Sequence, residues 1–139
     1  MTTGSFRLGR IGGIPIRAHW SVVFIALLFG VNLAAALGVV AGAIAIVAFF
    51  LSILAHELGH AFTARHYGVN TESIDLWALG GVARLDRESP SPRADGLIAV
   101  AGPVVSLLIG GITFGSAFLV ESSVLAWIGF VNLALAAFN

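Results

Sequence analysis

The 139-residue sequence contains no cysteine and no lysine, and it has few charged residues of any kind. The lack of cysteine excludes a disulfide framework and any metal site built on thiolates. Only 10% of the residues are charged, whereas ordinary soluble domains have about 25%. The net charge is zero and there is no basic tract, which argues against a nucleic-acid partner. The remaining composition, 58% hydrophobic, is typical of a membrane protein.

Long uncharged runs divide the sequence. No charged residue lies between Arg17 and Glu57, a gap that is too long for one membrane span and fits two. A weak break at Leu37–Gly38 separates these two spans, and Tyr67–Gly68 is a plausible helix stop. We therefore predict a single transmembrane domain over residues 1–139. It would be an all-α membrane protein of about four transmembrane helices, approximately at 19–36, 40–66, 97–120 and 124–139.

The basic residues give an orientation. All seven are arginines, and each falls on the same side of the four-span arrangement: Arg7, Arg10, Arg17, Arg65, Arg84, Arg87 and Arg93. The positive-inside rule makes that side cytoplasmic. We expect a multi-pass protein of the cell membrane with a cytoplasmic N-terminus.

Two segments on the cytoplasmic side alternate between apolar and polar residues. They read SFRLGRIGGIPIRAH and SIDLWALGGVARLD, with turns expected at Gly12–Gly13 and Gly80–Gly81. We interpret them as short β-strands, paired in one small sheet at the cytoplasmic membrane surface. The alternative is two interfacial loops in which the alternation is accidental.

The second predicted span contains the sequence HELGH, which fits the H-E-x-x-H pattern. Residues four apart share a helix face, so His56 and His60 can bind one metal ion. Glu57 can accept a proton from a metal-bound water without being a ligand. Ionisable residues inside a membrane span are costly and usually functional. The alternative is a packed polar network between helices.

The depth of this motif matters for its chemistry. His56 lies roughly ten residues from the cytoplasmic end of its predicted helix, or about 15 Å at the helical rise per residue. A metal ion there would lie within the hydrocarbon region and would be reached by water from the cytoplasmic side.

Two other histidines are weaker candidates as a third ligand. His66 has the spacing of the longer H-E-x-x-H-x-x-G-x-x-H zinc pattern, but Thr63 replaces the glycine that ends the helix in that pattern. If the helix continues, His60 and His66 face different ways. His19, beside Trp20, suits the membrane interface.

Several motifs occur in an order that resembles a known family. HELGHAFTARHYGV on an apolar helix is followed by LGGVARL and then by AGPVVSLLIG on the next span. This order resembles the site-2 protease family of intramembrane zinc metalloproteases, peptidases of the M50 type. The N-terminal FRLGRIGGIPIRAHW is similar to the bacterial branch that often carries C-terminal CBS domains. The resemblance covers nearly the whole chain.

The resemblance implies roles for particular residues. Zn²⁺ would be bound by His56 and His60, with Glu57 as the general base. The strand GGVARL would hold the substrate in extended form by β-augmentation, through Gly80, Gly81 and Val82. A G-P-x-x-N/S element, which allows close helix packing, is matched by Gly102, Pro103 and Ser106. Gly102–Pro103 is equally compatible with a packing kink alone.

The sequence departs from the family in one respect. The third zinc ligand of the family is an aspartate in an N-x-x-P-x-x-P-x-D-G element, and Asn139 resembles the first residue of that element. No carboxylate lies on the last predicted span. The resemblance therefore implies a fragment that stops before the third ligand and before any CBS domain.

Two functions follow as hypotheses. The first is an intramembrane zinc metalloprotease that hydrolyses transmembrane segments of single-pass membrane proteins in the lipid bilayer. The alternative, favoured by the missing carboxylate, is an inactive fragment or pseudoprotease that binds membrane proteins. A small transporter or channel subunit has little support, because there is no internal repeat and no second intramembrane charge.

Overall fold

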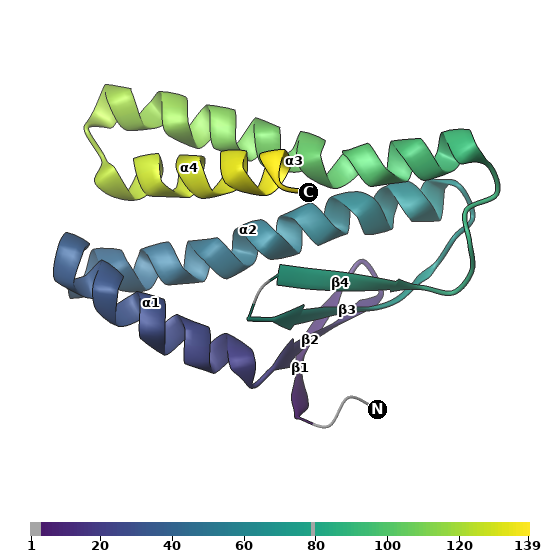
Figure 1. Cartoon of the computed structure of the whole chain (residues 1–139), viewed down its shortest axis with the longest axis horizontal. Helices are drawn as coiled ribbons and strands as arrows, with labels where there is room; N and C mark the ends of the chain where they lie inside the picture. Colours follow the sequence, from purple (N-terminus) through teal and green to yellow (C-terminus); the bar gives the residue numbers. More distant parts are fainter. Residues whose placement is uncertain (1–3, 79) are drawn as a thin grey trace.

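The computed structural model describes residues 4–78 and 80–139, and this part of the chain forms one four-stranded sheet and four helices (Figure 1). The strands are β1 (Ser5–Ile11), β2 (Ile14–His19), β3 (Thr71–Trp77) and β4 (Gly80–Leu85). The helices are α1 (Ser21–Leu37), α2 (Val39–His66), α3 (Pro92–Val120) and α4 (Ser123–Ala137). The predicted combination of helices with a small sheet is confirmed.

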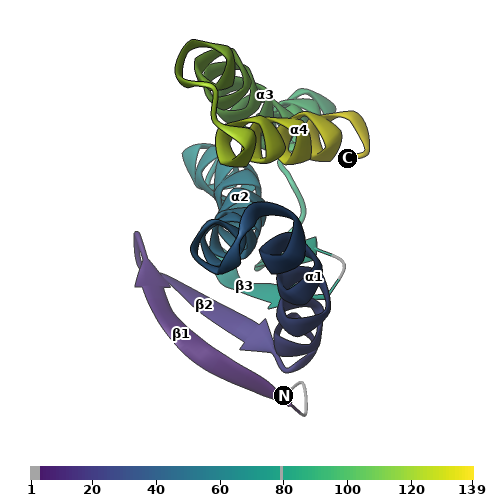
Figure 2. The same cartoon turned by 90° about the vertical axis from the view of Figure 1, so that its left-hand side faces the viewer.

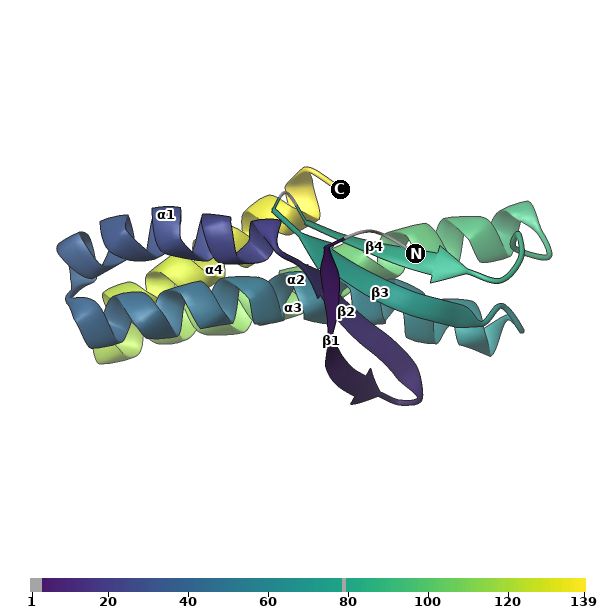
Figure 3. The same ribbon diagram turned by 90° about the horizontal axis from the view of Figure 1, so that it is seen from below.

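Helix α2 is the central element. It packs against each of the other three helices and against β3 and β4. Figures 1 and 2 show three layers, with α3 and α4 on one side of α2 and with α1 and the sheet on the other. Helix α1 lies along the N-terminal half of α2, and the sheet lies along its C-terminal half (Figure 3). The motif HELGH, in that C-terminal half, is therefore surrounded by other elements.

The first two helices end close to the predicted positions. Gly38 separates α1 from α2 with φ of 88°, and Gly68 follows α2 with φ of 79°. Both values lie in the region that glycine adopts without a steric penalty. Helix α1 begins two residues later than expected, at Ser21, because His19 is the last residue of β2.

Helix α3 extends beyond the predicted membrane span. The span is predicted to start near residue 97, and α3 begins at Pro92. Ser91 caps the helix, because its hydroxyl accepts a hydrogen bond from the backbone N–H of Ala94 at 3.2 Å. Proline at the first helical position is favourable because that residue needs no N–H donor. The charged residues Arg93 and Asp95 occupy the exposed first turn of this helix.

The sheet has the order β1-β2-β3-β4, with β2 and β3 parallel and the other pairs antiparallel. This pairing confirms the prediction of one small sheet and shows that the interfacial-loop alternative is wrong. Gly12 and Gly13 form the predicted turn with φ of 56° and 85°. Gly80 and Gly81 do not form the predicted turn, because they are the first residues of β4 and pair with Trp77 and Leu76.

One face of the sheet is buried against α2. Alternate residues of a strand point to the same face, and here these are Ile14 and Ile16 on β2 and Ile74 and Leu76 on β3. They form a cluster with side chains of α2 that include Ile53. This packing fixes β3, and therefore its hydrogen-bonded neighbour β4, beside the HELGH turn of α2.

The far end of the β3–β4 hairpin is closed by polar contacts. The backbone N–H of Asn70 donates to one carboxylate oxygen of Asp86 at 3.0 Å. The side-chain amide of Asn70 donates to the other oxygen at 3.1 Å. Arg87 also donates to both oxygens. These hydrogen bonds, chiefly the one from Arg87, lower the pKa of Asp86. They stabilise its charged form at the end of the hairpin.

Two of the four helices in the described part of the chain, α2 and α3, are long and apolar enough to cross a membrane. Helices α1 and α4 are also apolar but shorter, with 17 and 15 residues. Large apolar side chains point outward from all four, for example Leu27, Val47, Leu108 and Phe130. Such a surface is unusual for a soluble monomer.

Close packing of α1 on α2 depends on Gly42. A Cβ added at Gly42 would lie 2.5 Å from the backbone nitrogen of Ala34, so the two helices would have to separate. We expect Gly42→Ala to lower the free energy of unfolding by about 1–3 kcal/mol, the usual cost of overpacking. Gly111→Ala is the matched control, because nothing lies within 4 Å of that position. Unfolding in detergent with rising denaturant measures both, and equal midpoints would contradict the close contact.

Candidate metal centre

His56 and His60 lie on the same face of α2, one turn apart. Their Nε2 atoms are 3.1 Å apart, and their rings meet edge to face. Two nitrogen ligands on one tetrahedral zinc ion, each at about 2.0–2.1 Å, are separated by about 3.3 Å. The separation of the two imidazoles is therefore close to that required by a shared metal ion. Asn139 adds an amide oxygen, with Oδ1 at 2.8 Å from His56 Nε2.

The opposite nitrogen of each imidazole is held by α3. His60 Nδ1 donates to the backbone carbonyl of Ile98 at 2.7 Å, because a carbonyl oxygen can only accept. The lone pair of His60 therefore lies on Nε2 and faces His56. His56 Nδ1 lies 2.9 Å from the hydroxyl of Ser106, a buried contact. Such second partners fix the orientation of metal-binding imidazoles.

Gly102 of α3 lies directly against both imidazoles. A Cβ at this position would overlap His60 Nε2 and would lie 2.7 Å from His56 Nε2. Only glycine leaves the space in front of the two nitrogens open. Pro103 follows, and α3 continues through it as one helix to Val120. The G-P-x-x-S element predicted from the sequence therefore lies beside the histidine pair, with Ser106 bonded to one of its rings.

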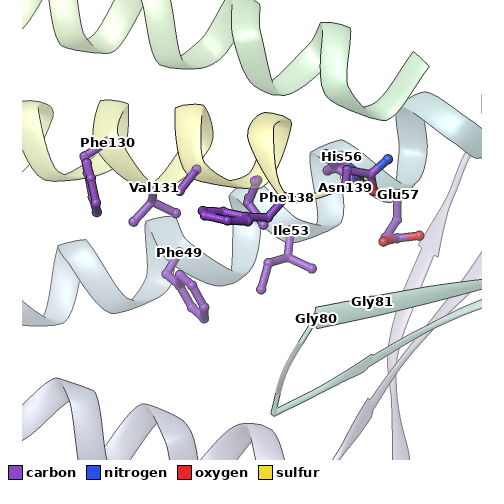
Figure 4. Close-up of a pocket in the computed structure, with 12 residues that line it drawn as sticks. Phe49, Ile53, His56, Glu57, Gly80, Gly81, Phe130, Val131, Phe138 and Asn139 are labelled. Atoms are coloured by element: carbon purple, nitrogen blue, oxygen red, sulfur yellow. Dashed lines mark hydrogen bonds between the residues drawn. The ribbon is translucent and has the colours of Figure 1, made fainter. Parts of the chain in front are cut away.

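The side chain of Glu57 points towards the sheet, whereas His56 and His60 face α3. The Glu57 side chain lies against Gly81 at the start of β4, where a Cβ would come within 3.0 Å of Glu57 Cδ. The carboxylate thus lies between α2 and the strand. Figure 4 shows it beside His56 and above Gly81.

A cavity of about 400 Å³ opens beside these residues (Figure 4). Its polar end is formed by His56, Glu57 and Asn139. The other lining residues are apolar or glycine and come from α2, β4 and the last part of the chain: Phe49, Ile53, Gly80, Gly81, Phe130, Val131, Ala134, Leu135 and Phe138. The cavity can therefore hold an apolar chain next to a polar end.

Other predicted candidates lie elsewhere. Val82 is exposed and lines a different hollow, with Asp75 and Arg84, on another face of the sheet. His66 lies at the exposed end of α2 with its ring against Tyr67. His19 Nδ1 lies 2.9 Å from the hydroxyl of Ser21. The structure thus brings Gly80 and Gly81 to the cavity, but it does not bring Val82 there.

Sequence reasoning missed some residues near the site. The apolar cavity wall from α4 has no local signature, because its members look like any lipid-facing residues. Asn132 did carry a signal that was not used, since it is an amide within the otherwise apolar α4. Within residues 4–78 and 80–139 no group of three His, Cys, Asp or Glu side chains could hold a metal ion. The third ligand predicted from the family element stays a prediction.

The model of peptidase family M50 matches residues 44–124, which include most of the histidine helix α2, the β3–β4 hairpin and all of α3. This chain belongs to peptidase family M50. It is similar to the site-2 protease from Methanocaldococcus jannaschii, with a TM-score of 0.79 and 32% identity over 96% of this chain and 63% of that one.

Curated relatives are similar over most of this chain. Putative zinc metalloprotease Rip3 of Mycobacterium tuberculosis is 41% identical over 95% of this chain and 38% of its own length. Putative zinc metalloprotease sll0528 of Synechocystis is 33% identical over 97% of this chain and 40% of its own length. Zinc metalloprotease MJ0392 of M. jannaschii is 38% identical over 76% of this chain and 30% of its own length. The M50 chain therefore spans at most about two-fifths of the length of these relatives.

Gly102→Ala tests the metal centre without altering a ligand. We expect the added methyl group to displace both imidazoles and to lower zinc affinity at least about tenfold, because ligand geometry is lost. Gly96→Ala on the same helix is the control, since nothing lies within 4 Å of it. Zinc affinity is measured by competition with a chromophoric chelator. Equal affinity in both variants would show that the two nitrogens do not share an ion.

Ser106→Ala tests the hydrogen bond behind His56. Loss of a second partner typically lowers metal affinity 10- to 100-fold, and we expect a change in that range. Ser116→Ala, ten residues further along α3, should leave the affinity unchanged. A Ser106→Ala protein with the affinity of the wild type would rule out a role for this hydroxyl in orienting the imidazole.

Proposed function

We propose that this chain carries the catalytic centre of an intramembrane zinc metalloprotease, which hydrolyses peptide bonds within transmembrane segments of membrane proteins. The observation that carries the proposal is the convergence of the two imidazoles beside Glu57 at the polar end of an apolar cavity. The names of the M50 relatives, zinc metalloproteases and a site-2 protease, agree with it.

In this proposal His56 and His60 bind the zinc ion through Nε2, and the family aspartate supplies a further ligand. Zinc, when bound, acidifies a coordinated water and polarises the carbonyl group that is attacked. Ser106 and the carbonyl of Ile98 hold the two imidazoles in place from α3. Gly102 keeps the space in front of them clear.

Glu57 is the proposed general base. It lies next to His56 in sequence and lines the same cavity, so it can accept the proton of the attacking water and return it to the leaving amine. The close contact with Gly81 restricts where its carboxylate can point. A longer residue at position 81 would occupy the place of that carboxylate.

Strand β4 is the proposed substrate-binding edge. In the described sheet it pairs with β3 on one side only, so its other edge can pair with an extended peptide. A transmembrane helix must unwind before cleavage, because its peptide groups are enclosed in their own hydrogen bonds. Gly80 and Gly81 at the cavity allow close approach of that peptide. Val82, the next residue of β4, would also contact it. Single-pass membrane proteins are the proposed substrates.

We further propose one multi-pass domain in the cell membrane, with the N-terminus in the cytoplasm. Helices α2 and α3 are long enough to cross the bilayer, and the apolar helices α1 and α4 would complete four spans. The arginines before α1 and between α2 and α3 support this orientation by the positive-inside rule.

A membrane-protein binding module without proteolytic activity is the second candidate. It is favoured by the ligand set in the described residues, where the centre consists of two histidines and the amide of Asn139. Cleavage of a labelled single-pass transmembrane peptide by the 139-residue form would count against this candidate. Binding of the peptide without cleavage, by both this form and a longer one, would support it.

Replacement of the base separates catalysis from metal binding. We expect Glu57→Gln in the longest expressed form to reduce cleavage of the labelled peptide about 10²- to 10⁴-fold, the usual contribution of a general base. Zinc content should stay the same, because Glu57 is not a proposed ligand. Glu88→Gln, in the exposed loop before α3, is the matched control. Turnover like that of the wild type in Glu57→Gln would refute the assignment.

A further inference from the structure

A buried hydrogen bond joins α4 to α2 outside the metal centre. Asn132 of α4 is fully buried, and Ser52 of α2 is 5% exposed. The side-chain amide of Asn132 donates to the hydroxyl of Ser52 at 2.8 Å. On α4 the cavity is lined by the neighbouring Val131, whereas Asn132 points towards α2. The proposed catalytic reaction does not use this pair.

The bonding pattern fixes the orientation of the amide. The hydroxyl of Ser52 donates to the carbonyl of Ala48 at 2.8 Å, so towards Asn132 it can only accept. The amide of Asn132 also donates to the carbonyl of Ile128 at 2.9 Å. A flipped amide would place its oxygen against two acceptors. The Oδ1 atom of Asn132 is buried and has no partner in residues 4–78 and 80–139. Burial of this amide therefore already costs free energy, and loss of the bond to Ser52 would raise that cost.

Helix α4 packs closely on α3, where Gly129 lies against Phe114, and Asn132 is the side chain of α4 that hydrogen-bonds to α2. Between apolar helices in lipid there is no hydrophobic driving force, and close packing of small residues together with interhelical hydrogen bonds determines the register. A shift of one turn, about 5.4 Å, exchanges one alanine or leucine of α4 for another on the side that faces α2. The same shift removes Asn132 from Ser52. A single buried asparagine sets the register of coiled coils by the same logic.

The register of α4 on α2 also determines a contact at the metal centre. Ser52 and His56 are one turn apart on α2, and α4 runs alongside α2 in the same direction (Figure 1). Asn139, seven residues after Asn132, has its Oδ1 atom 2.8 Å from His56 Nε2. A one-turn shift of α4 would move this contact by more than the length of a hydrogen bond.

We propose that Asn132, through its hydrogen bond to Ser52, is a positioning residue that sets the register of α4 on α2 and so places the end of α4 against His56 and His60. The inference rests on the proposed function only in taking this histidine pair as the metal centre.

Because the sequence has no cysteine, the register can be measured by disulfide cross-linking in liposomes. The pair Phe49→Cys and Trp127→Cys reports the native register, since these rings lie 6.2 Å apart. Phe49→Cys combined with Ser123→Cys or Val131→Cys reports a shift of one turn in either direction. The measured quantity is the ratio of native to shifted cross-links, relative to the unmutated background.

Two single substitutions remove the bond. After Asn132→Leu, Ser52 keeps its bond to Ala48; after Ser52→Ala, one N–H of the Asn132 amide keeps its bond to Ile128 and the other loses its partner. We expect each to lower the ratio about 3- to 20-fold, the range for an interhelical hydrogen bond in a membrane. The double variant should be no worse than either single variant. The exchanged pair, Ser52→Asn with Asn132→Ser, should restore the native ratio, which a purely volume-filling role would not predict.

Zinc affinity in the same liposomes, measured with a chromophoric chelator, is the second readout. It should fall severalfold in Asn132→Leu and recover in the exchanged pair. A native cross-linking ratio in Asn132→Leu or in Ser52→Ala would overturn the proposal, and so would a lost register with unchanged zinc affinity. If even the wild type binds no zinc, the proposed function fails, while the cross-linking ratio still decides the register.

Discussion

The structure depends on satisfying the polar side chains that α2 carries into apolar surroundings. An unpaired polar group there costs several kcal/mol, so each needs a partner from a neighbouring element. The ring of His56 contacts the hydroxyl of Ser106, and the ring of His60 donates a hydrogen bond to the carbonyl of Ile98. Both partners lie on α3. Glu57 lies against Gly81 of β4. The position of α3 relative to α2 follows from the contacts of the two histidines.

Such contacts require close approach, and glycine provides it. A hydrogen bond of about 3 Å between side chains on packed helices leaves no room for further atoms at the contact. Gly102 lies against both imidazoles, Gly81 lies against Glu57, and Gly42 lies against the backbone of α1. The same closeness shapes the cavity, because β4 can cover the carboxylate only where it carries no side chain. Packing and chemistry are therefore constrained at the same positions.

Local patterns predicted most elements correctly, and the misses have clear causes. The ends of α2, the four strands and their membership of one sheet were predicted from periodicity and glycine. Helix α3 starts one turn before the predicted span, because Ser91 and Pro92 begin it ahead of the charged residues Arg93 and Asp95. Gly80 and Gly81 were assigned to a turn because the two-glycine pattern is the same in a turn and in a strand that passes close to another chain.

The sequence by itself determined the features that depend on neighbours along one helix or strand. Four-residue spacing is enough to place His56 and His60 on one face, and the long apolar runs are enough to predict helices suited to lipid. Only the tertiary structure decided which groups meet across elements. Ser106 is 50 residues from the imidazole it contacts, and Asn132 is 80 residues from Ser52. Periodicity carries no information at such separations, because these pairs arise from how whole helices pack.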